Sequence, residues 1–381
     1  MKKLIYCISF LILLLCTGCH SSDNRTVIQF ASWGSQSEIE ILKPILAEYE
    51  KQNPNIKIDF LHIPQNYFQK IHLLFASNLA PDVIFINNLN IPVYENYLED
   101  LTNYIDKEDF YEKTLNAMSY EGRLLAIPRD VSTLVVYYNK TLFDRYRVPY
   151  PSQNWDYNDL IKIGLELKSH GVYGISFDEN PIFYLPYLMS DGGGILSDDL
   201  KQEIIDNKNS QKGLNFYADL RNKYNIAPKK SQSASATMAQ MFLQQKLAMH
   251  LSGRWMVPKY RATADFDWDI INFPSGTADS IVPLDASGWA LCKSSKNKDE
   301  AVKFIKYLSS KDNISKMTES GLITPARIDV ANSSVFLNGK PNSSYVFLDT
   351  VKTAKPTPVS KNYNELTDSL NVKLEPIFNP Q

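Results

Sequence analysis

Most enzyme chemistry needs nucleophiles, bases or metal ligands at fixed spacings, and this 381-residue chain has none of the spacings that define the common catalytic motifs. It lacks a Gly-x-Ser-x-Gly turn, a phosphate loop ending in Gly-Lys-Ser/Thr and a His-Glu-x-x-His pair. No two of its histidines stand at close ligand spacing: His20, His62, His72, His170 and His250. We therefore predict a protein without catalytic residues, metal or cofactor.

One glycine run has two interpretations. Gly192 to Gly194 follow Asp191, and backbone amides in such a run can cradle an anion. More often a run of this kind forms a tight loop that lets the backbone come close to another segment. The sequence leaves both interpretations open.

Aromatic side chains are more informative. The chain has 22 Tyr, 18 Phe and 5 Trp, and the flat apolar face and polar edge of Tyr and Trp suit the binding of sugar rings. Between Lys246 and Trp255, a short strand pattern runs into a Ser-Gly turn and the start of a helix. Trp255 would lie in the first turn of that helix, either as a ligand-binding side chain or as part of the core.

The first nineteen residues form an export signal. Two lysines precede an apolar run from Leu4 to Leu15, which at about 12 residues is too short to span a membrane. Its end, Cys16-Thr17-Gly18-Cys19, resembles the bacterial lipoprotein signal, in which a cysteine after a small residue is lipidated. We predict a signal peptide at 1–18 and lipidation at Cys19, with an ordinary secretory peptide as the alternative. Either way, the protein works outside the cytoplasm.

Composition narrows the choice further. The net charge is −2, or −4 without the two leader lysines, and there is no basic block, which argues against nucleic-acid binding. Hydrophobic residues make up 44% of the chain, as in globular proteins with a substantial core. Cys292 is the one cysteine after Cys19, so no disulfide within the mature chain is expected. The length suffices for two domains.

Hydrophobic periodicity predicts an α/β fold. Strand patterns at 27–31, 56–60 and 82–86 alternate with two helical patterns, the first of which begins with a capping box formed by Ser35 and Glu38. Strands that start about 27 residues apart, with helices between them, are typical of a parallel sheet. Ligands bind beyond the carboxyl ends of such strands, so the loops there are the expected place for a site.

Further patterns follow along the chain. Prolines and Asn154 at 149–154 are typical of a linker between domains. Beyond the first unit the sequence predicts strands at 134–138, 172–177, 269–273 and 287–291, and helices from near Trp155, at 209–224, 235–246 and 297–309, and through Leu366 and Leu370.

Seven short segments occur in an order that points to a known family. They are Ala80 to Val83, Ile127 to Asp130 leading to Tyr138 to Phe143, Asp191 to Gly194, Lys246 to Trp255, Ser287 to Ala290, Ser295 to Ala301, and Gly321 to Arg327. In these segments the chain resembles the extracellular solute-binding proteins of bacterial ABC transporters, in the maltose-binding-like, carbohydrate-binding branch. The resemblance covers almost the whole chain after the leader.

The resemblance implies a periplasmic-binding-protein fold, in which two α/β lobes are joined by crossing strands and close on a ligand in a central cleft. The lobes would be discontinuous. After a tether at 19–23, residues 24–130 with 274–325 would form the N-terminal lobe, and 131–273 with 326–381 the C-terminal lobe. In this division the prolines at 149–154 lie in a loop inside the second lobe, not in a linker.

The same resemblance, together with the strand ends, suggests the ligand-binding residues. Trp255 and Trp289 resemble aromatics that stack on sugar rings, and Trp33 and Tyr67 sit at strand ends that face the same cleft. Carboxylate and guanidinium groups can bond adjacent hydroxyls bidentately. The polar candidates are Asp82, Asn87, Arg129, Asp130, Asp285 and Arg327.

These observations predict a lipid-anchored, monomeric receptor that captures a sugar or oligosaccharide and delivers it to the transmembrane subunits of an ABC permease. One alternative is the same role for a glycerol-phosphate-type solute, with Arg129, Arg254 or Arg327 as anchors. Another is an enzyme that acts on polysaccharide in the same cleft, with two carboxylates placed across the ligand. A surface adhesin or sensor subunit is the third.

Overall fold

The computed structural model describes residues 24–233 and 237–380. The predicted signal peptide, Cys19 and the tether at 19–23 lie outside these residues. None of the helices in the described part of the chain has both the length and the apolar character needed to cross a bilayer.

The first lobe is built on a seven-stranded sheet with the strand order β12-β6-β11-β3-β1-β2, to which β13 adds by pairing with β11. As predicted, β1 is parallel to both β2 and β3, whereas β11 runs antiparallel to β3 and β6. The strands are β1 Thr26–Ser32, β2 Ile56–His62, β3 Val83–Asn87, β6 Ile127–Ser132, β11 Pro283–Leu291, β12 Thr324–Pro325 and β13 Lys355–Pro356.

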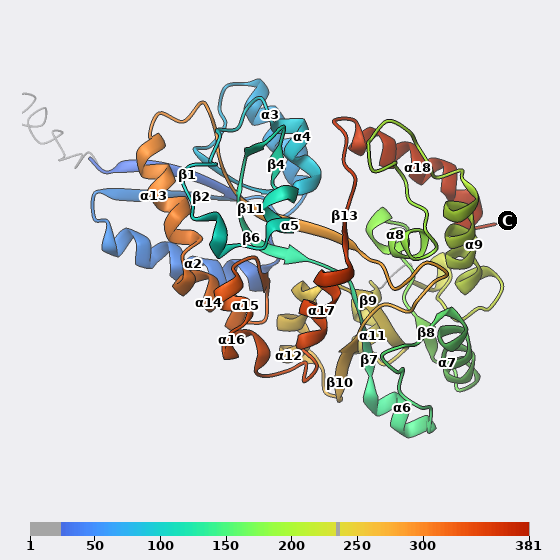
Figure 1. The fold of residues 1–381 in the computed structure, drawn as a ribbon. Coiled ribbons are helices and arrows are strands. Elements are labelled where there is room, and N and C mark those ends of the chain that lie inside the picture. The colour runs from blue at the N-terminus through green and yellow to red at the C-terminus, as the bar shows by residue number, and fades with distance from the viewer. Residues whose placement is uncertain (1–23, 234–236, 381) are drawn as a thin grey trace, which may run out of the picture.

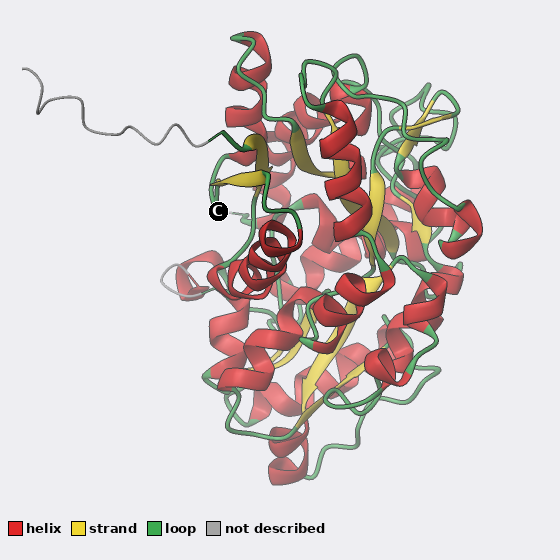
Figure 2. Cartoon of the chain, turned by 90° about the vertical axis from the view of Figure 1, so that its left-hand side faces the viewer, coloured by secondary structure: helices red, strands yellow, loops and turns green. Residues whose placement is uncertain are grey.

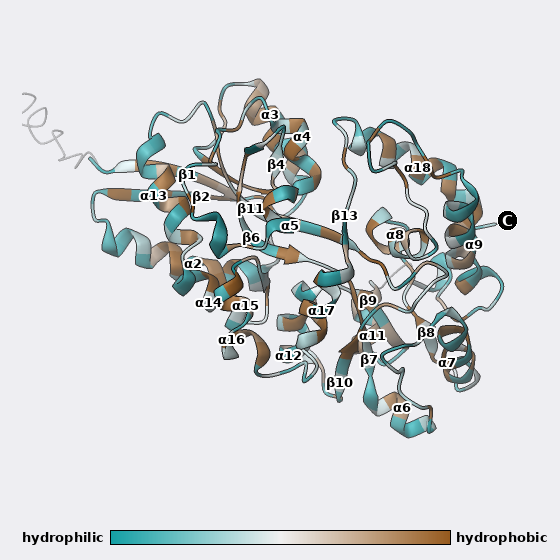
Figure 3. Ribbon diagram, viewed as in Figure 1, coloured by the Kyte–Doolittle hydropathy of each residue, from teal (hydrophilic) through white to brown (hydrophobic). Residues whose placement is uncertain are grey.

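Both faces of this sheet are buried. Along β3, Val83 and Phe85 belong to one hydrophobic cluster, and Ile84 and Ile86 belong to another on the opposite face. Helices therefore enclose the strands (Figure 2), and an outer helix such as α2 is largely hydrophilic on its outer surface (Figure 3). These elements are α2 Gln36–Gln52, α3 Tyr67–Ala76, α4 Ile91–Tyr94, α5 Glu112–Ala117, α13 Lys298–Leu308 and α14 Lys311–Glu319, with a small hairpin of β4 Ser119–Tyr120 and β5 Arg123–Leu124.

The second lobe has a four-stranded sheet with the order β10-β7-β9-β8. Its strands are β7 Val135–Asn139, β8 Tyr173–Ile175, β9 Leu247–Ser252 and β10 Trp268–Ile271. The helices around it are α6 Lys140–Tyr146, α7 Tyr157–Ser169, α8 Pro181–Ser190, α9 Lys208–Asn222, α10 Lys230–Ser233, α11 Met238–Leu243, α12 Val257–Thr263, α17 Tyr345–Thr353 and α18 Tyr363–Phe378.

Most predicted elements are present, and the differences have local causes. The helix expected at 235–246 ends at Leu243, because Gln245 adopts a left-handed backbone with φ of 57°. The strand expected at 287–291 begins four residues earlier, at Pro283. The capping box of Ser35 and Glu38 is formed as predicted.

Apart from β13, which lies between α17 and α18 and pairs with the first residues of β11, three segments of the described chain connect the lobes (Figure 1). β6 leads into β7, β10 leads into β11, and after β12 the chain passes through α15 Ile328–Ala331 and α16 Ser334–Leu337 to α17. Each sheet thus takes strands from distant parts of the sequence, which makes the lobes discontinuous. The residues at which the lobes divide stay predictions.

The proline-rich stretch at 149–154 lies inside the second lobe. It connects α6 to α7, and the indole nitrogen of Trp155 donates to the carbonyl oxygen of Asn272 in the same lobe at 2.9 Å. The local pattern typical of a linker therefore marks a loop, as the family resemblance implied.

Candidate functional site

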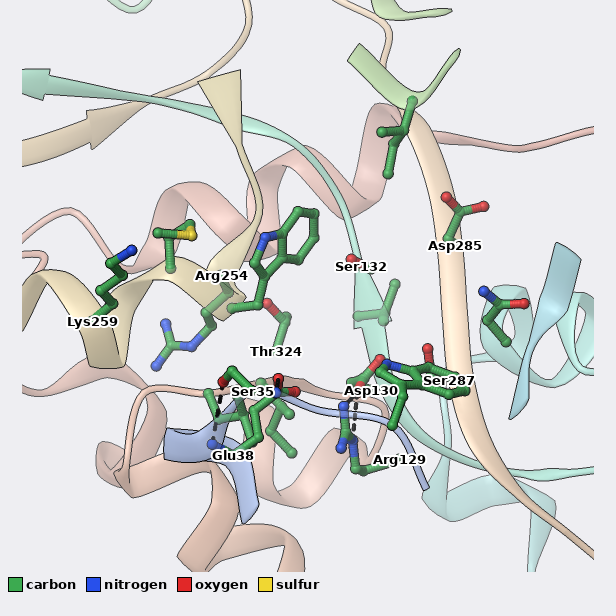
Figure 4. A pocket seen from close by; sticks show the side chains of 18 of the residues that line it. Ser35, Glu38, Arg129, Asp130, Ser132, Arg254, Lys259, Asp285, Ser287 and Thr324 are labelled. Atoms are coloured by element: carbon green, nitrogen blue, oxygen red, sulfur yellow. Dashed lines mark hydrogen bonds and ion pairs between the residues drawn. The ribbon is translucent and has the colours of Figure 1, made fainter. Parts of the chain in front are cut away.

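A cavity of about 640 Å³ lies between the two lobes (Figure 4). The first lobe contributes the ends of β1, β3, β6 and β11 together with the start of α2. The second lobe contributes the turn that follows β9, α12 and parts of α8 and α11. Its polar and aromatic lining includes Trp33, Ser35, Glu38, Asn87, Arg129, Asp130, Ser132, Thr237, Arg254, Trp255, Lys259, Asp285, Ser287 and Thr324.

Sheet register brings the polar groups of the first lobe together. Asn87 on β3 stands opposite Ser287 on β11, and Ser287 stands opposite Asp130 on β6. Three residues from distant parts of the sequence therefore form one row across three neighbouring strands, at the edge of the sheet that faces the second lobe. Asp285 and Ser132 form a second pair two residues along the same strands.

Arg129 and Asp130 form an ion pair within this wall. The Nε atom of Arg129 donates to an Asp130 carboxylate oxygen at 2.6 Å, and the guanidinium lies 4.2 Å from the centre of the Phe85 ring. The Phe85 ring also packs against Trp33 with ring centres 4.3 Å apart. Burial raises the pKa of Asp130 although Arg129 opposes the shift. The first wall is thus a stacked and hydrogen-bonded surface.

Asp285 is fixed in a similar way. The Asn88 amide donates to the Asp285 carboxylate at 3.1 Å, while the Asn88 side-chain oxygen accepts from the backbone N–H of Ala286 at 3.0 Å. Burial raises the pKa of Asp285. Beside it, the Asn87 side-chain oxygen accepts from the amide of Asn90 at 2.7 Å. The orientations of Asp285 and Asn87 are therefore set before any ligand arrives.

The second lobe presents Trp255 beside a glycine that its indole ring covers. β9 ends at Ser252, Gly253 follows, and Trp255 lies in the short 3-10 turn Arg254–Met256 that precedes α12. A Cβ atom on Gly253 would lie 1.8 Å from the Trp255 ring, because the indole covers this glycine. Tyr137 also donates to the Gly253 carbonyl oxygen at 2.8 Å. The Trp255 ring is half-buried and lines the cavity.

The structure brings six of the ten predicted site residues to this cavity. They come from both lobes and from all four strand ends named above: Trp33, Asn87, Arg129, Asp130, Trp255 and Asp285.

Tyr67 and Asp82 were predicted to face the ligand, and the structure places both elsewhere. Tyr67 is buried, and its hydroxyl donates to the carbonyl oxygen of Ala31 at 3.0 Å. Asp82 precedes β3, so it lies at the amino end of a strand whose carboxyl end faces the cavity. Its carboxylate accepts from the Gln29 backbone N–H at 2.8 Å and from the Ser295 hydroxyl at 2.5 Å. Both residues hold the first lobe together.

The structure also places Trp289 and Arg327, both predicted to bind the ligand, away from the lining of this cavity. Trp289 is 1% exposed and belongs to the hydrophobic core beneath the sheet of the first lobe. It follows Ser287 on the same face of β11, but two residues further from the cleft, which is about 7 Å. Arg327 forms ion pairs with Asp109 at 2.9 Å and Asp329 at 3.0 Å, outside the cavity.

Several residues that line the cavity were not predicted from the sequence. Ser35 and Glu38 were identified as a capping box alone, and Ser287 and Thr324 occur in the family segments but were not singled out. Lys259 follows Trp255 by one turn of helix, and that spacing could have identified it.

Packing explains the glycine run. A Cβ on Gly193 would lie 2.4 Å from the backbone nitrogen of Ser210, so this run is a tight loop against α9. In residues 24–233 and 237–380, no group of three or more His, Cys, Asp or Glu side chains could hold a metal ion.

Residues 33–314 match the family described as bacterial extracellular solute-binding protein. The chain belongs to this family. The resemblance drawn from the seven segments is thereby confirmed, and the family's extracellular character agrees with a location outside the cytoplasm. The chain is also 22% identical to the galactooligosaccharide-binding protein of Bacillus subtilis over 353 residues, which cover 88% of this chain and 80% of that protein.

Solved structures of solute-binding proteins share the fold. An ABC substrate-binding protein from Listeria monocytogenes in complex with cycloalternan has a TM-score of 0.87 at 24% identity, covering 93% of this chain and 94% of that one. The GacH receptor of Streptomyces glaucescens, solved unliganded and with acarbose, has a TM-score of 0.85 at 22% identity, covering 93% of each chain. The two-lobed periplasmic-binding-protein fold predicted for this chain is confirmed.

Proposed function

We propose that this solute-binding protein captures a sugar or oligosaccharide in the cavity between its lobes and delivers it to an ABC permease. One observation carries the proposal. The half-buried rings of Trp33 and Trp255, on opposite lobes, line the same cavity as a row of fixed polar side chains. A cavity of about 640 Å³ is in the range of small-molecule sites.

Sugars offer the chemistry that this lining matches. A pyranose ring has an apolar face for an indole and hydroxyls that both donate and accept, which Asn87, Asp130 and Asp285 can bond. Covering about 100 Å² of an indole face contributes roughly 2.5 kcal/mol at 25 cal/mol per Å². Two such faces with a few hydrogen bonds suffice for micromolar affinity, about −8 kcal/mol, after the cost of closure.

The work of the protein is differential binding and not covalent chemistry. Side chains from both lobes line the cavity, so a ligand that touches both stabilises the arrangement in which the lobes are close. The connecting segments between β6 and β7 and between β10 and β11 are the natural hinges. Relatives named for galactooligosaccharide binding, and structures holding cycloalternan or acarbose, support a saccharide as the ligand class.

The N-terminus provides the membrane anchor in this proposal. Lipidation of Cys19 would tether a monomeric receptor to the cell membrane beside its permease. Replacement by Cys19→Ala should release the protein from the membrane fraction, and Cys16→Ala should leave it there. Retention of the Cys19 variant on membranes would rule out this anchor.

The sugar is tested by thermal shift of the purified protein against mono-, di- and oligosaccharides, with glycerol phosphates and amino acids as controls. A ligand at about 100 times its Kd should stabilise the protein by roughly 2.7 kcal/mol. Chromatography of the same mixtures should return the saccharide unchanged. Shifts confined to amino acids or glycerol phosphates would overturn the sugar, and cleaved saccharide would overturn the non-enzymatic role.

A further inference from the structure

The second-lobe wall of the cavity carries two cations and no acidic side chain. Arg254 and Lys259 belong to one short segment, the 3-10 turn and α12, and Figure 4 shows both on the side of the cavity opposite Asp285. The other second-lobe side chains in the lining are Ile182, Thr237, Ala239, Trp255 and Met256. None of these can neutralise a cation.

Arg254 has no polar partner. It is 3% exposed, and within the described residues its Nε, Nη1 and Nη2 atoms are buried without a hydrogen bond. Its guanidinium lies 4.1 Å from the centre of the Phe336 ring and 5.2 Å from that of Phe347. Burial lowers its pKa to about 9, so the group stays charged at neutral pH. A buried cation without a hydrogen bond costs stability, and its retention calls for a functional reason.

The acidic groups of the opposite wall are already engaged. Asp130 pairs with Arg129, and Asp285 accepts from Asn88. Glu38 accepts from the backbone N–H of Ser35 at 2.7 Å. Lys259 is exposed and has no ion-pair partner within the described part of the chain. These hydrogen bonds hold Asp285 and Glu38 in the first wall and leave their charges in place, so the lining as a whole has three acidic and three basic side chains. The excess of positive charge is confined to the second wall, where neither Arg254 nor Lys259 has an acidic partner among the described residues.

We propose that the ligand is a saccharide carrying an acidic group, and that this group binds against the wall formed by Arg254 and Lys259. The inference rests on the proposed function and narrows its ligand class. The Lys259 ammonium is the direct partner, because the Arg254 nitrogens are covered. Arg254 acts through its field, which a low-dielectric site screens weakly. Trp255, between the two in sequence, would hold the sugar ring that bears the acid.

A measurement without any sugar tests the positive wall by itself. Among the described tryptophans, Trp155, Trp268 and Trp289 are buried, so a small quencher in solution reaches mainly Trp33 and Trp255. Iodide should quench this fluorescence at least about twice as well as caesium, relative to neutral acrylamide. The preference should fall in Arg254→Met and Lys259→Met and remain in Lys303→Met, an exposed control on α13. Equal quenching by iodide and caesium would overturn the proposal.

Binding to matched ligands provides the second test. Titration calorimetry would compare galacturonate oligomers, galactose oligomers of the same linkage, and galactose phosphates. The tightest ligand should be acidic, by at least about tenfold over its neutral partner, with the preference lost in Lys259→Met and reduced in Arg254→Met. Comparison of the galacturonate oligomers with the galactose phosphates shows whether the acidic group is a carboxylate or a phosphate. A neutral sugar that binds as tightly as its acidic partner would overturn the inference and leave the proposed function standing.

Stability separates a ligand-binding role from a structural one. Arg254→Met keeps the length of the side chain and removes the buried charge, so the Tm of the empty protein should rise while acidic saccharide binds more weakly. A lower Tm with unchanged saccharide affinity would show that Arg254 serves only to pack against Phe336 and Phe347, and would contradict the proposal.

Discussion

The two walls of the cavity are built differently. In the first lobe the charged groups of the lining are paired or hydrogen-bonded within the wall, as with Arg129 and Asp130, and its half-buried ring, Trp33, packs on the core aromatic Phe85. In the second lobe Trp255 lies over Gly253, and neither Arg254 nor Lys259 has an acidic partner within the described residues. The polar groups of the first wall have partners within the protein, whereas we propose that the cations of the second wall find theirs in the ligand.

Because of this difference, we expect substitutions in the two walls to affect different properties, namely stability in the first wall and affinity for the ligand in the second. Side chains of the first wall are continuous with the packing beneath them, so their removal is expected mainly to lower stability. Side chains of the second wall have few partners to lose, so their removal is expected mainly to lower affinity. Each of the following experiments can contradict this distinction between effects on stability and effects on affinity.

Trp289→Ala should have the largest effect. Trp289 is 1% exposed in the core beneath the first wall, and loss of such a side chain costs about 3–5 kcal/mol of unfolding free energy. Urea unfolding measures this loss, while the affinity of the folded protein for saccharide should stay close to wild type. A variant of normal stability that no longer binds sugar would instead restore Trp289 as a ligand residue.

Acid should affect the two lobes in opposite directions. His250, on the strand that leads to Trp255, is buried against Tyr260, and burial lowers its pKa to about 3. The unfolded chain takes up that proton near pH 6.5, so this group costs roughly 2 kcal/mol of stability between pH 7 and pH 5. Burial raises the pKa of Asp130 and Asp285, so their contribution falls as the pH rises above the ordinary carboxyl range.

Unfolding followed by urea at pH 7 and pH 5 checks this contrast. His250→Gln should reduce the loss of stability on acidification, and Asp285→Asn should leave a loss at least as large as in the wild type. His170→Gln is the matched control, because His170 is exposed on the surface of the same lobe. An unchanged acid response in the His250 variant would show that another group governs the second lobe.

Trp255→Ala tests the second wall directly. Loss of the indole face should weaken saccharide binding at least about tenfold, because an apolar area of roughly 100 Å² is no longer covered. The ring is half-buried, so the loss of stability should be smaller than for Trp289→Ala. Calorimetry with the best saccharide measures the first effect, and Trp255→Phe should recover part of it. Wild-type affinity in the alanine variant would remove Trp255 from the site.

The comparison also explains which parts of the site could be predicted from sequence. The local pattern of a strand, a Ser-Gly turn and a helix start predicted that Trp255 follows the strand at the start of a helix, and the structure has it there. That pattern left open whether the ring meets a ligand or the core, and the family resemblance pointed to the cavity that it lines. The parallel order of β1, β2 and β3 likewise follows from local periodicity and spacing. Such features need no knowledge of distant contacts.

Other parts depend on register and depth, which local patterns do not contain. Trp289 and Ser287 share a face of β11, and only the position of the lobe edge decides which of them meets the ligand. The row of Asn87, Ser287 and Asp130 arises from pairing between strands up to about two hundred residues apart. Asp82 shows a different error, since it stands at the amino end of its strand.

Tyr67→Phe should give the smallest effect and the finest test of the division between the walls. The hydroxyl donates to Ala31 in the core of the first lobe, so its removal should cost about 1 kcal/mol of unfolding free energy and leave saccharide affinity unchanged. Tyr97→Phe is the control, because Tyr97 is 42% exposed and its stability should not change. If Tyr67→Phe instead weakens saccharide binding while the free energy of unfolding is unchanged, the core beneath the first wall takes part in closure of the lobes. Substitutions in the first wall would then affect affinity as well, against the distinction drawn from the contacts of the two walls.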